Sequence, residues 1–270
     1  MTKFLFWNIN KRPLEQLVAD LVSEHQVDVL ILAECIIPVG RMLETLNPGT
    51  TSEFHATYSE CEKIQIYTRF SGRFIEPLFE SGRFTIRRIR LPLRTEILVA
   101  AVHLPSKLYW TDHSQNLECS ELARTIREVE ENVGHARTLL VGDFNMNPFE
   151  EGVFAAAGLH SVMARSVALR GKRTVQGRDY PFFYNPMWGH FGDRIAGPPG
   201  TYYYERAEHT TMFWNMFDQV MLRPDLVPLF EDTELLIVDM VGDKSLVSPT
   251  GLPDTLIGSD HLPLLFGLNL

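Results

Sequence analysis

The chain has 270 residues, of which 45% are hydrophobic, and this is enough apolar surface for a substantial core, so disorder of the whole chain is excluded. The formal net charge of −9 excludes a protein that coats nucleic acid by bulk electrostatics, although an enzyme with a local basic groove stays compatible with it. Three cysteines without metal or disulfide spacing, no signal peptide and no apolar run of about 18 residues predict a soluble cytoplasmic protein with reduced thiols and no membrane contact.

The first elements predicted are a strand, a helix and a second strand. Phe4–Asn8 is a short apolar run, and residues 14–22 carry leucine and valine at helical spacing. Asp28–Glu34 is an unbroken apolar run that closes on one carboxylate and is typical of a strand covered on both faces. Asn8 and Glu34 then lie at strand ends, where Asn8 could simply cap the backbone and Glu34 could be a solvated loop carboxylate.

The next segment predicts a loop over Asn47–Tyr58, a strand over Ile64–Thr68, and an antiparallel pair formed by Arg83–Leu91 and Ile97–His103. The last strand of this pair ends in the sequence Val-His-Leu-Pro-Ser, so His103 is another polar group that closes an apolar run. A histidine in such a place is either a structural hydrogen-bonding residue or a catalytic one.

A helix over Leu117–Val133 leads into a strand over Leu139–Val141, and this repeat of strand, helix and strand favours an α/β protein with layered sheets. Gly142, Asp143 and Asn145 follow at once. If this backbone is extended, the Asp143 carboxylate and the Asn145 amide point to one side and Phe144 to the other. The alternative is an ordinary turn, since these residue types dominate turns.

Arg165–Arg206 differs in character from the rest of the chain. It contains seven Lys and Arg against three Asp and Glu, a balance of +4, interleaved with aromatic residues and broken by Gly-Pro-Pro-Gly. Such a stretch can bind a nucleic-acid strand through its phosphates and bases, or it can be an ordered surface loop whose aromatics pack on the core. The candidate substrate-binding residues here and just beyond are Arg170, Lys172, Arg173, Asn185, Trp188 and Trp214.

The C-terminal part predicts strands over Phe213–Leu222 and Leu235–Val241, a loop over Lys244–Thr255, and a last strand through Leu268. Asp218 enters the first of these strands and needs a partner, because an unpaired buried carboxylate is costly. Ser259-Asp260-His261 is either a turn or an acid/base pair.

The chemistry-bearing residues nearly all lie at strand ends or starts, and several are acidic. Carboxylates gathered in one place repel one another, so a divalent cation is the natural reason to gather them. The sequence has no internal repeat and no obvious linker. We therefore expect one domain over residues 1–270, with a basic aromatic insertion at about 165–206.

The order and wording of the motifs resemble the endonuclease/exonuclease/phosphatase superfamily, which includes DNase I-like and exonuclease III-like enzymes. The motifs are Trp7-Asn8-Ile9-Asn10, Leu32-Ala33-Glu34, His103-Leu104-Pro105-Ser106, Gly142-Asp143-Phe144-Asn145, Phe217-Asp218-Gln219-Val220 and Ser259-Asp260-His261. The resemblance implies a four-layered α/β sandwich, with two central mixed β-sheets flanked by helices. It also implies hydrolysis of a phosphoester with Mg²⁺ or Mn²⁺ as cofactor.

The resemblance assigns a role to each matched position. Glu34 is the main metal ligand with Asn8 beside it, and Asp260 completes the metal side. Asp143 orients or deprotonates the attacking water, and Asn145 holds that water or a non-bridging oxygen. His261, oriented by Asp218, contacts the phosphate or exchanges a proton, and His103 stabilises the charge that develops on the phosphoryl oxygens.

Two departures concern the substrate. Asn10 stands where many abasic-site endonucleases carry Asp, and His103 stands where they tend to carry Tyr, so specificity for abasic sites is in doubt. The first expectation is a nuclease acting on DNA or RNA. The second is a phosphodiesterase or phosphatase acting on a nucleotide, a sugar phosphate or a lipid head group. A catalytically silent binding module is disfavoured, because none of the matched positions is replaced.

Overall fold

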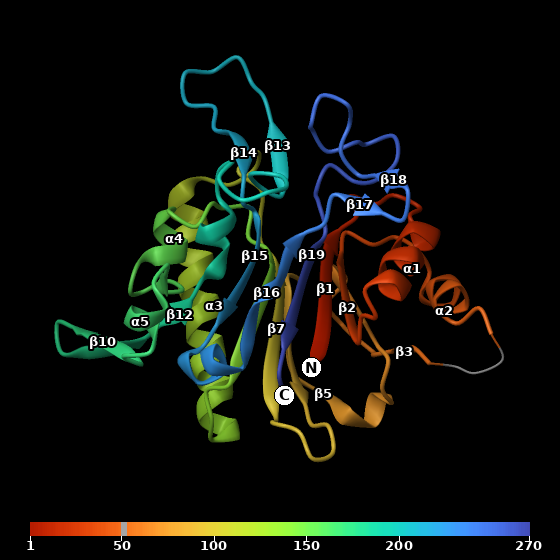
Figure 1. The fold of residues 1–270 in the computed structure, drawn as a ribbon. Coiled ribbons are helices and arrows are strands. Elements are labelled where there is room, and N and C mark those ends of the chain that lie inside the picture. The colour runs from red at the N-terminus through yellow and green to blue at the C-terminus, as the bar shows by residue number, and fades with distance from the viewer. Residues whose placement is uncertain (50–52) are drawn as a thin grey trace.

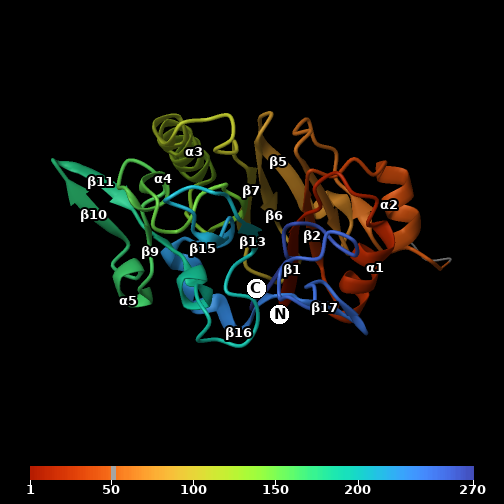
Figure 2. The same cartoon turned by 90° about the horizontal axis from the view of Figure 1, so that it is seen from above.

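The computed structural model describes residues 1–49 and 53–270. Two large β-sheets pack face to face, and helices cover the outer face of each (Figures 1 and 2). The predicted four-layered α/β sandwich is therefore confirmed. Within these ranges, no helix is both long and apolar enough to cross a membrane.

The first sheet has the strand order β16-β19-β1-β2-β4-β3. Its strands are β1 (Thr2–Asn8), β2 (Val29–Ala33), β3 (His55–Ala56), β4 (Ile64–Thr68), β16 (Phe230–Ile237) and β19 (Leu264–Leu268). β1 pairs in parallel with β2 and antiparallel with β19, so the two ends of the chain share the centre of this sheet. Helices α1 (Glu15–Glu24) and α2 (Val39–Leu46) lie on its outer face (Figure 2).

The second sheet has the strand order β5-β6-β7-β8-β15-β12-β9. Its strands are β5 (Ile75–Glu80), β6 (Phe84–Ile89), β7 (Ile97–His103), β8 (Thr138–Asp143), β9 (Ser161–Val162), β12 (Phe183–Tyr184) and β15 (Asp218–Leu222). Helix α3 (Asp112–Val133) connects the parallel strands β7 and β8 and lies on the outer face with α4 (Glu151–Phe154) and α5 (Arg165–Ala168).

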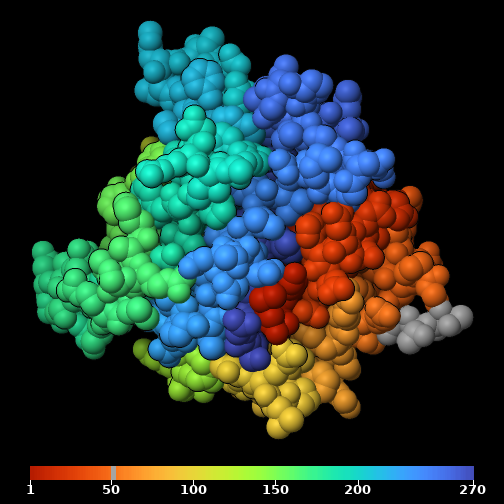
Figure 3. All heavy atoms as spheres, viewed as in Figure 1, coloured from red at the N-terminus to blue at the C-terminus, as the bar shows by residue number. Residues whose placement is uncertain are grey.

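Three short hairpins stand outside the sheets. They are β10 (Lys172–Val175) with β11 (Arg178–Pro181), β13 (Tyr202–Tyr204) with β14 (Phe213–Asn215), and β17 (Met240–Val241) with β18 (Lys244–Ser245). Short 3-10 helices are η1 (Gly72–Phe74), η2 (Pro186–His190) and η3 (Pro224–Leu229). In Figure 3 the β10–β11 hairpin projects at the lower left, while the segment after β13 rises at the top of the molecule.

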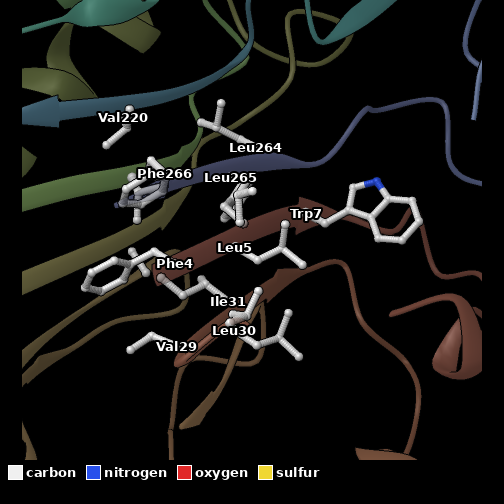
Figure 4. Close-up of a cluster of buried hydrophobic side chains, with 14 of the residues drawn as sticks. Phe4, Leu5, Trp7, Val29, Leu30, Ile31, Val220, Leu264, Leu265 and Phe266 are labelled. Atoms are coloured by element: carbon white, nitrogen blue, oxygen red, sulfur yellow. The ribbon is translucent and has the colours of Figure 1, made fainter. Parts of the chain in front are cut away.

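The main core fills the space between the two sheets, and Figure 4 shows part of it. Phe4 of β1 stacks on Phe266 of β19 with ring centroids 5.2 Å apart, and both side chains are fully buried. A second cluster lies between the second sheet and α3, where Leu122 and Ile126 are buried. Burying such side chains contributes roughly 1.5–3 kcal/mol each, so this packing holds the strands that carry the site.

Most predicted strands are present, but several boundaries differ. The expected helix over 117–133 begins earlier, at Asp112, because the Thr111 side chain accepts a hydrogen bond from the Ser114 amide at 3.3 Å and caps the helix. The expected strand over 213–222 is two strands, β14 and β15, interrupted at Met216 and Phe217. The expected loop over 47–58 contains β3, and its residues 50–52 lie outside the described residues. Helix α2 was not predicted.

The segment 165–206 is also different from the surface loop considered above. It contains α5, the β10–β11 hairpin and β12, and β12 is an internal strand of the second sheet, paired with β15 and β9. This segment is thus partly built into the sandwich.

Candidate active site

A cleft of about 1060 Å³ opens at the edge where β1, β2, β7 and β8 end. The chain turns there after apolar strands, so polar residues that follow each strand come together. Seven of the predicted catalytic and metal residues line the cleft: Asn8, Glu34, His103, Asp143, Asn145, Asp260 and His261. The eighth, Asp218, is fully buried directly behind them.

Asp143 lies at the centre of this group. Its Oδ2 accepts hydrogen bonds from Asn8 Nδ2 at 2.9 Å and Asn145 Nδ2 at 3.2 Å. Its Oδ1 accepts one from the Asn145 backbone N–H at 2.8 Å. Two imidazole nitrogens face the same Oδ2, with His103 Nε2 at 3.6 Å and His261 Nε2 at 3.9 Å. One carboxylate therefore connects residues from both sheets.

The backbone before Asp143 permits only glycine. A Cβ on Gly142 would lie 2.0 Å from the Val102 carbonyl oxygen on the neighbouring strand. After Asp143 the chain leaves the extended conformation, because Asn145 has a φ of 50° in the left-handed region. The expectation of an extended Asp143-Phe144-Asn145 is wrong in its geometry, yet the tight turn still brings both polar side chains together and buries Phe144.

Glu34 follows β2 with a φ of 47°, which is uncommon for a residue with a side chain and is typical of functional sites. Its Oε1 lies 3.3 Å from His103 Nε2, and its Oε2 lies 3.5 Å from Lys11 Nζ. The contact with His103 outweighs partial burial and, with Lys11 and Lys63, lowers the pKa of Glu34 to about 2. Glu34 is thus an ionised carboxylate at neutral pH.

His261 and Asp218 form a buried pair. His261 Nδ1 and Asp218 Oδ2 are 2.8 Å apart. Burial by itself would lower the pKa of His261, but the carboxylates of Asp218, Asp143 and Asp260 outweigh it and raise the pKa to about 10. His261 therefore carries a positive charge near neutral pH and presents Nε2–H toward the cleft.

Several residues that hold this pair have no signal in the sequence. The Trp7 indole N–H donates to the His261 carbonyl oxygen at 2.8 Å, and the Asp218 backbone N–H donates to Thr201 Oγ1 at 3.0 Å. The Tyr202 ring packs against the His261 imidazole with centroids 4.6 Å apart. These contacts join segments far apart in the chain, so residue spacing alone could not reveal them.

The carboxylate oxygens of the cleft lining fit a hard divalent cation. Among residues 1–49 and 53–270, the one cluster of three acidic or histidine groups with ligand atoms within 4.8 Å of one another is Asp143, Asp218 and His261. In that cluster Asp218 and His261 are already hydrogen bonded, and the charged imidazole has no free lone pair. The ionised Glu34 on the cleft wall offers the oxygen ligands that Mg²⁺ prefers.

The structure does not bring the predicted substrate-binding residues to this cleft. Arg170 precedes the β10–β11 hairpin, and Lys172 and Arg173 lie on it; none of the three lines the cleft. This hairpin projects from the side of the molecule (Figure 1). Lys172 pairs with Asp179 on the same hairpin. Asn185 is fully buried, with its amide donating to Gln219 and its side-chain oxygen accepting from the Met187 amide, which corrects its assignment.

The two tryptophans in that prediction also lie outside the cleft. Trp188 lines a separate apolar hollow together with Phe149, and Trp214 packs edge-on against Tyr203. From the basic aromatic segment, only Tyr202, Tyr204 and Arg206 reach the cleft wall.

Comparison with solved structures finds the same fold at low sequence identity. The structure of the 3′ phosphatase NExo from Neisseria, bound to a product DNA hairpin, is 14% identical with a TM-score of 0.58, over 100% of both chains. The D. rerio TDP2 structure with a single-strand DNA product is 14% identical with a TM-score of 0.57, over 98% of this chain and 97% of that chain. The human Nocturnin catalytic domain is 15% identical with a TM-score of 0.54, over 98% and 93%.

No curated protein matches the sequence significantly. The model of the endonuclease/exonuclease/phosphatase family matches residues 5–261, which is nearly the whole chain and includes every residue of the cluster around Asp143. Endonucleases, exonucleases and phosphatases all hydrolyse phosphoester bonds. The chain belongs to the endonuclease/exonuclease/phosphatase family.

Proposed function

We propose that the chain is a divalent-cation-dependent phosphoesterase that acts as a nuclease on phosphodiester bonds of DNA or RNA. The observation that supports this most is the Asp143 carboxylate, which accepts amide hydrogen bonds from Asn8 and Asn145 and faces the imidazoles of His103 and His261. Phosphoryl transfer needs a positioned water and neutralisation of negative charge.

The charge states suggest separate roles for the two sides of the site. His261 holds its proton near neutral pH, so it acts as a donor to a phosphoryl oxygen or to the leaving oxygen. Asp143 is then the group that orients the attacking water or accepts its proton, and Asn145 holds that water or a non-bridging oxygen. A new phosphorus–oxygen bond forms from water, the ester bond breaks, and the leaving oxygen gains a proton.

Glu34, Asn8 and Asp260 are the proposed ligands of Mg²⁺ or Mn²⁺. Glu34 is ionised and lies beside the end of β1, because Asn8 pairs with Ala33 in the sheet register. When bound there, the cation supplies positive charge to the phosphoryl oxygens. His103, close to both Glu34 and Asp143, would stabilise charge on the same oxygens.

The proposed substrate class rests on the cleft and on the related structures. The volume of about 1060 Å³ is at the upper end of the range for small-ligand pockets, which supports a large substrate. The Neisseria and D. rerio proteins were both solved with DNA products. A small phosphoester is the second candidate, favoured by the net charge of −9. We also propose that residues 1–270 are one domain, since both sheets contribute to this cleft.

A panel assay tests the proposal. The purified chain is offered single-stranded DNA, double-stranded DNA, RNA and small phosphodiesters, with Mg²⁺, with Mn²⁺ and with excess EDTA. We expect hydrolysis that requires the cation and that falls by at least about 10²-fold in the Asp143→Asn and His261→Ala variants.

Asp225→Asn is the matched control, because it changes an exposed carboxylate outside the cleft. Full activity in EDTA would refute the cation requirement, and near-native turnover of the folded Asp143→Asn variant would refute the site. Hydrolysis of small phosphodiesters alone would select the second candidate.

A further inference from the structure

Exposed apolar side chains from two segments of the chain line the cleft. The turn after β7 presents Leu108 and Tyr109, which are 69% and 87% exposed, next to Trp110. The β13–β14 hairpin presents Tyr204 and Met212, which are 39% and 49% exposed. Single exposed apolar residues are common, but their gathering around one cleft marks a binding surface.

An aromatic surface also continues from the catalytic group outward. Tyr202 packs against His261 at 4.6 Å and against Phe217 at 5.2 Å between ring centroids. Tyr204 follows on the same face of the strand, 6.5 Å from Tyr202 with the rings only 14° from parallel. A group attached to a phosphate beside His261 would therefore meet aromatic rings.

The charges on the cleft wall do not form a track for a phosphate backbone. Five Lys and Arg face six Asp and Glu on the lining. The cations also have acidic neighbours: Arg83 lies 2.9 Å from Glu118 and Arg206 lies 3.1 Å from Glu208, while Lys107 pairs with Glu150. In the part of the chain that the structure describes, Lys63 is the one Lys or Arg of this lining without an ion pair.

Arg83 also contacts the aromatic ring of Trp110 in the cleft lining. Its guanidinium lies 4.3 Å from the centroid of the Trp110 ring and so fixes that ring. A wall of rings with balanced charge is suited to bases rather than to backbone phosphates, since each base offers a face for stacking.

We propose that the cleft recognises its substrate through unpaired nucleobases next to the scissile phosphate, which stack on Tyr109 and Trp110 of the turn after β7 and on Tyr204 of the β13–β14 hairpin. This inference rests on the proposed phosphoesterase function of the same site. It selects single-stranded or terminal nucleotides, because a base that leaves its neighbours to stack on these rings cannot stay paired within a duplex. Phosphates farther along the strand contribute little to binding.

The kinetic test uses a single-stranded oligonucleotide, the same sequence within a duplex, and an oligonucleotide with base-free tetrahydrofuran residues on both sides of the cleavage position. Tyr109→Ala and Tyr204→Ala are each expected to raise KM for the single strand by about 5-fold or more, with a smaller change in kcat. Tyr109→Phe keeps the ring and should retain the native KM. Tyr58→Ala is the control, because Tyr58 is 81% exposed but lies outside the cleft.

Salt dependence gives a second readout. A protein that contacts 6–10 phosphates loses roughly 10³–10⁵ in affinity between 50 and 200 mM salt, whereas recognition through bases should lose less than about 10-fold. The proposal is overturned if the base-free substrate is cleaved as well as the normal one, if neither tyrosine variant changes KM, or if the salt dependence is steep.

Binding without turnover separates this inference from the proposed function. An oligonucleotide containing 2-aminopurine is titrated with the intact protein, and stacking on the tyrosines should quench its fluorescence. If no phosphoester is hydrolysed but quenching occurs and disappears in Tyr109→Ala, the proposed function fails and the stacking surface stands. If hydrolysis occurs without quenching, the proposed function stands and the stacking surface is refuted.

Discussion

The contact between Asp218 and His261 gives a graded prediction for activity. Asp218 is fully buried, and its Oδ2 lies 2.8 Å from His261 Nδ1. A hydrogen bond to a charged group contributes about 1.5–3 kcal/mol, against about 0.5–1.5 kcal/mol for a neutral one. Asp218→Asn keeps the volume and one neutral acceptor, so we expect it to lose about 1–2 kcal/mol of transition-state stabilisation, or roughly 5–30-fold in kcat.

Asp218→Ala removes the whole interaction and should lower kcat by roughly 10–150-fold, more than Asp218→Asn does. The assay is steady-state hydrolysis of the best substrate from the panel with saturating Mg²⁺. Urea unfolding followed by circular dichroism shows whether each variant is folded. If both variants are folded and turn over within about 2-fold of the native rate, His261 does not depend on Asp218 and the proposed division of roles is wrong.

Three further predictions concern the fold around the site. Gly142→Ala should lower the free energy of unfolding, measured in urea, by about 3 kcal/mol or more, because its Cβ would lie 2.0 Å from the Val102 carbonyl oxygen. Gly40→Ala is the control, since a Cβ at Gly40 would have no atom within 4 Å, and it should change the free energy of unfolding by less than about 1 kcal/mol. A similar effect of both would contradict the steric explanation. Burial raises the pKa of Cys35 to about 11 and of Cys119 to about 12, so the folded protein should resist thiol reagents at pH 8 and react only after unfolding; rapid native labelling would disprove this. Burial and nearby Arg173 lower the pKa of His160 below 6.5, so at His160 the folded state binds fewer protons than the unfolded state. The free energy of unfolding should therefore fall as the pH drops below about 6.5, by up to about 1.4 kcal/mol per pH unit. His160→Asn should flatten this dependence, and an unchanged pH profile would refute the prediction.

The sequence predicted the strands that carry the site because each is an uninterrupted apolar run that ends in a polar residue. The bounds of Ile97–His103 and Ile64–Thr68 are those of β7 and β4. Helix α2 was missed, since it has only eight residues and buries only two side chains, Met42 and Leu46, so its apolar spacing extends over little more than two turns.

Most of the predicted substrate-binding residues lie outside the cleft for a physical reason. Composition identifies a basic aromatic stretch, but it does not say which way each hairpin points. The β10–β11 hairpin carries Lys172 and Arg173 away from the cleft, while the β13–β14 hairpin brings Tyr204 to it. Asn185 illustrates the same difficulty, because its amide is used up inside the core by Gln219.

The position of the site between the two sheets makes its geometry depend on their packing. Asn8 ends β1 and Glu34 follows β2, both in the first sheet, whereas His103 and Asp143 end strands of the second sheet. His261 is held by contacts to both sheets. The Asn8 to Asp143 hydrogen bond of 2.9 Å therefore crosses from one sheet to the other. A shift of one sheet against the other by about 1 Å would separate these groups, and misplacement on that scale can cost 10²-fold in rate. The large apolar core between the sheets is thus what holds the proposed catalytic groups in register.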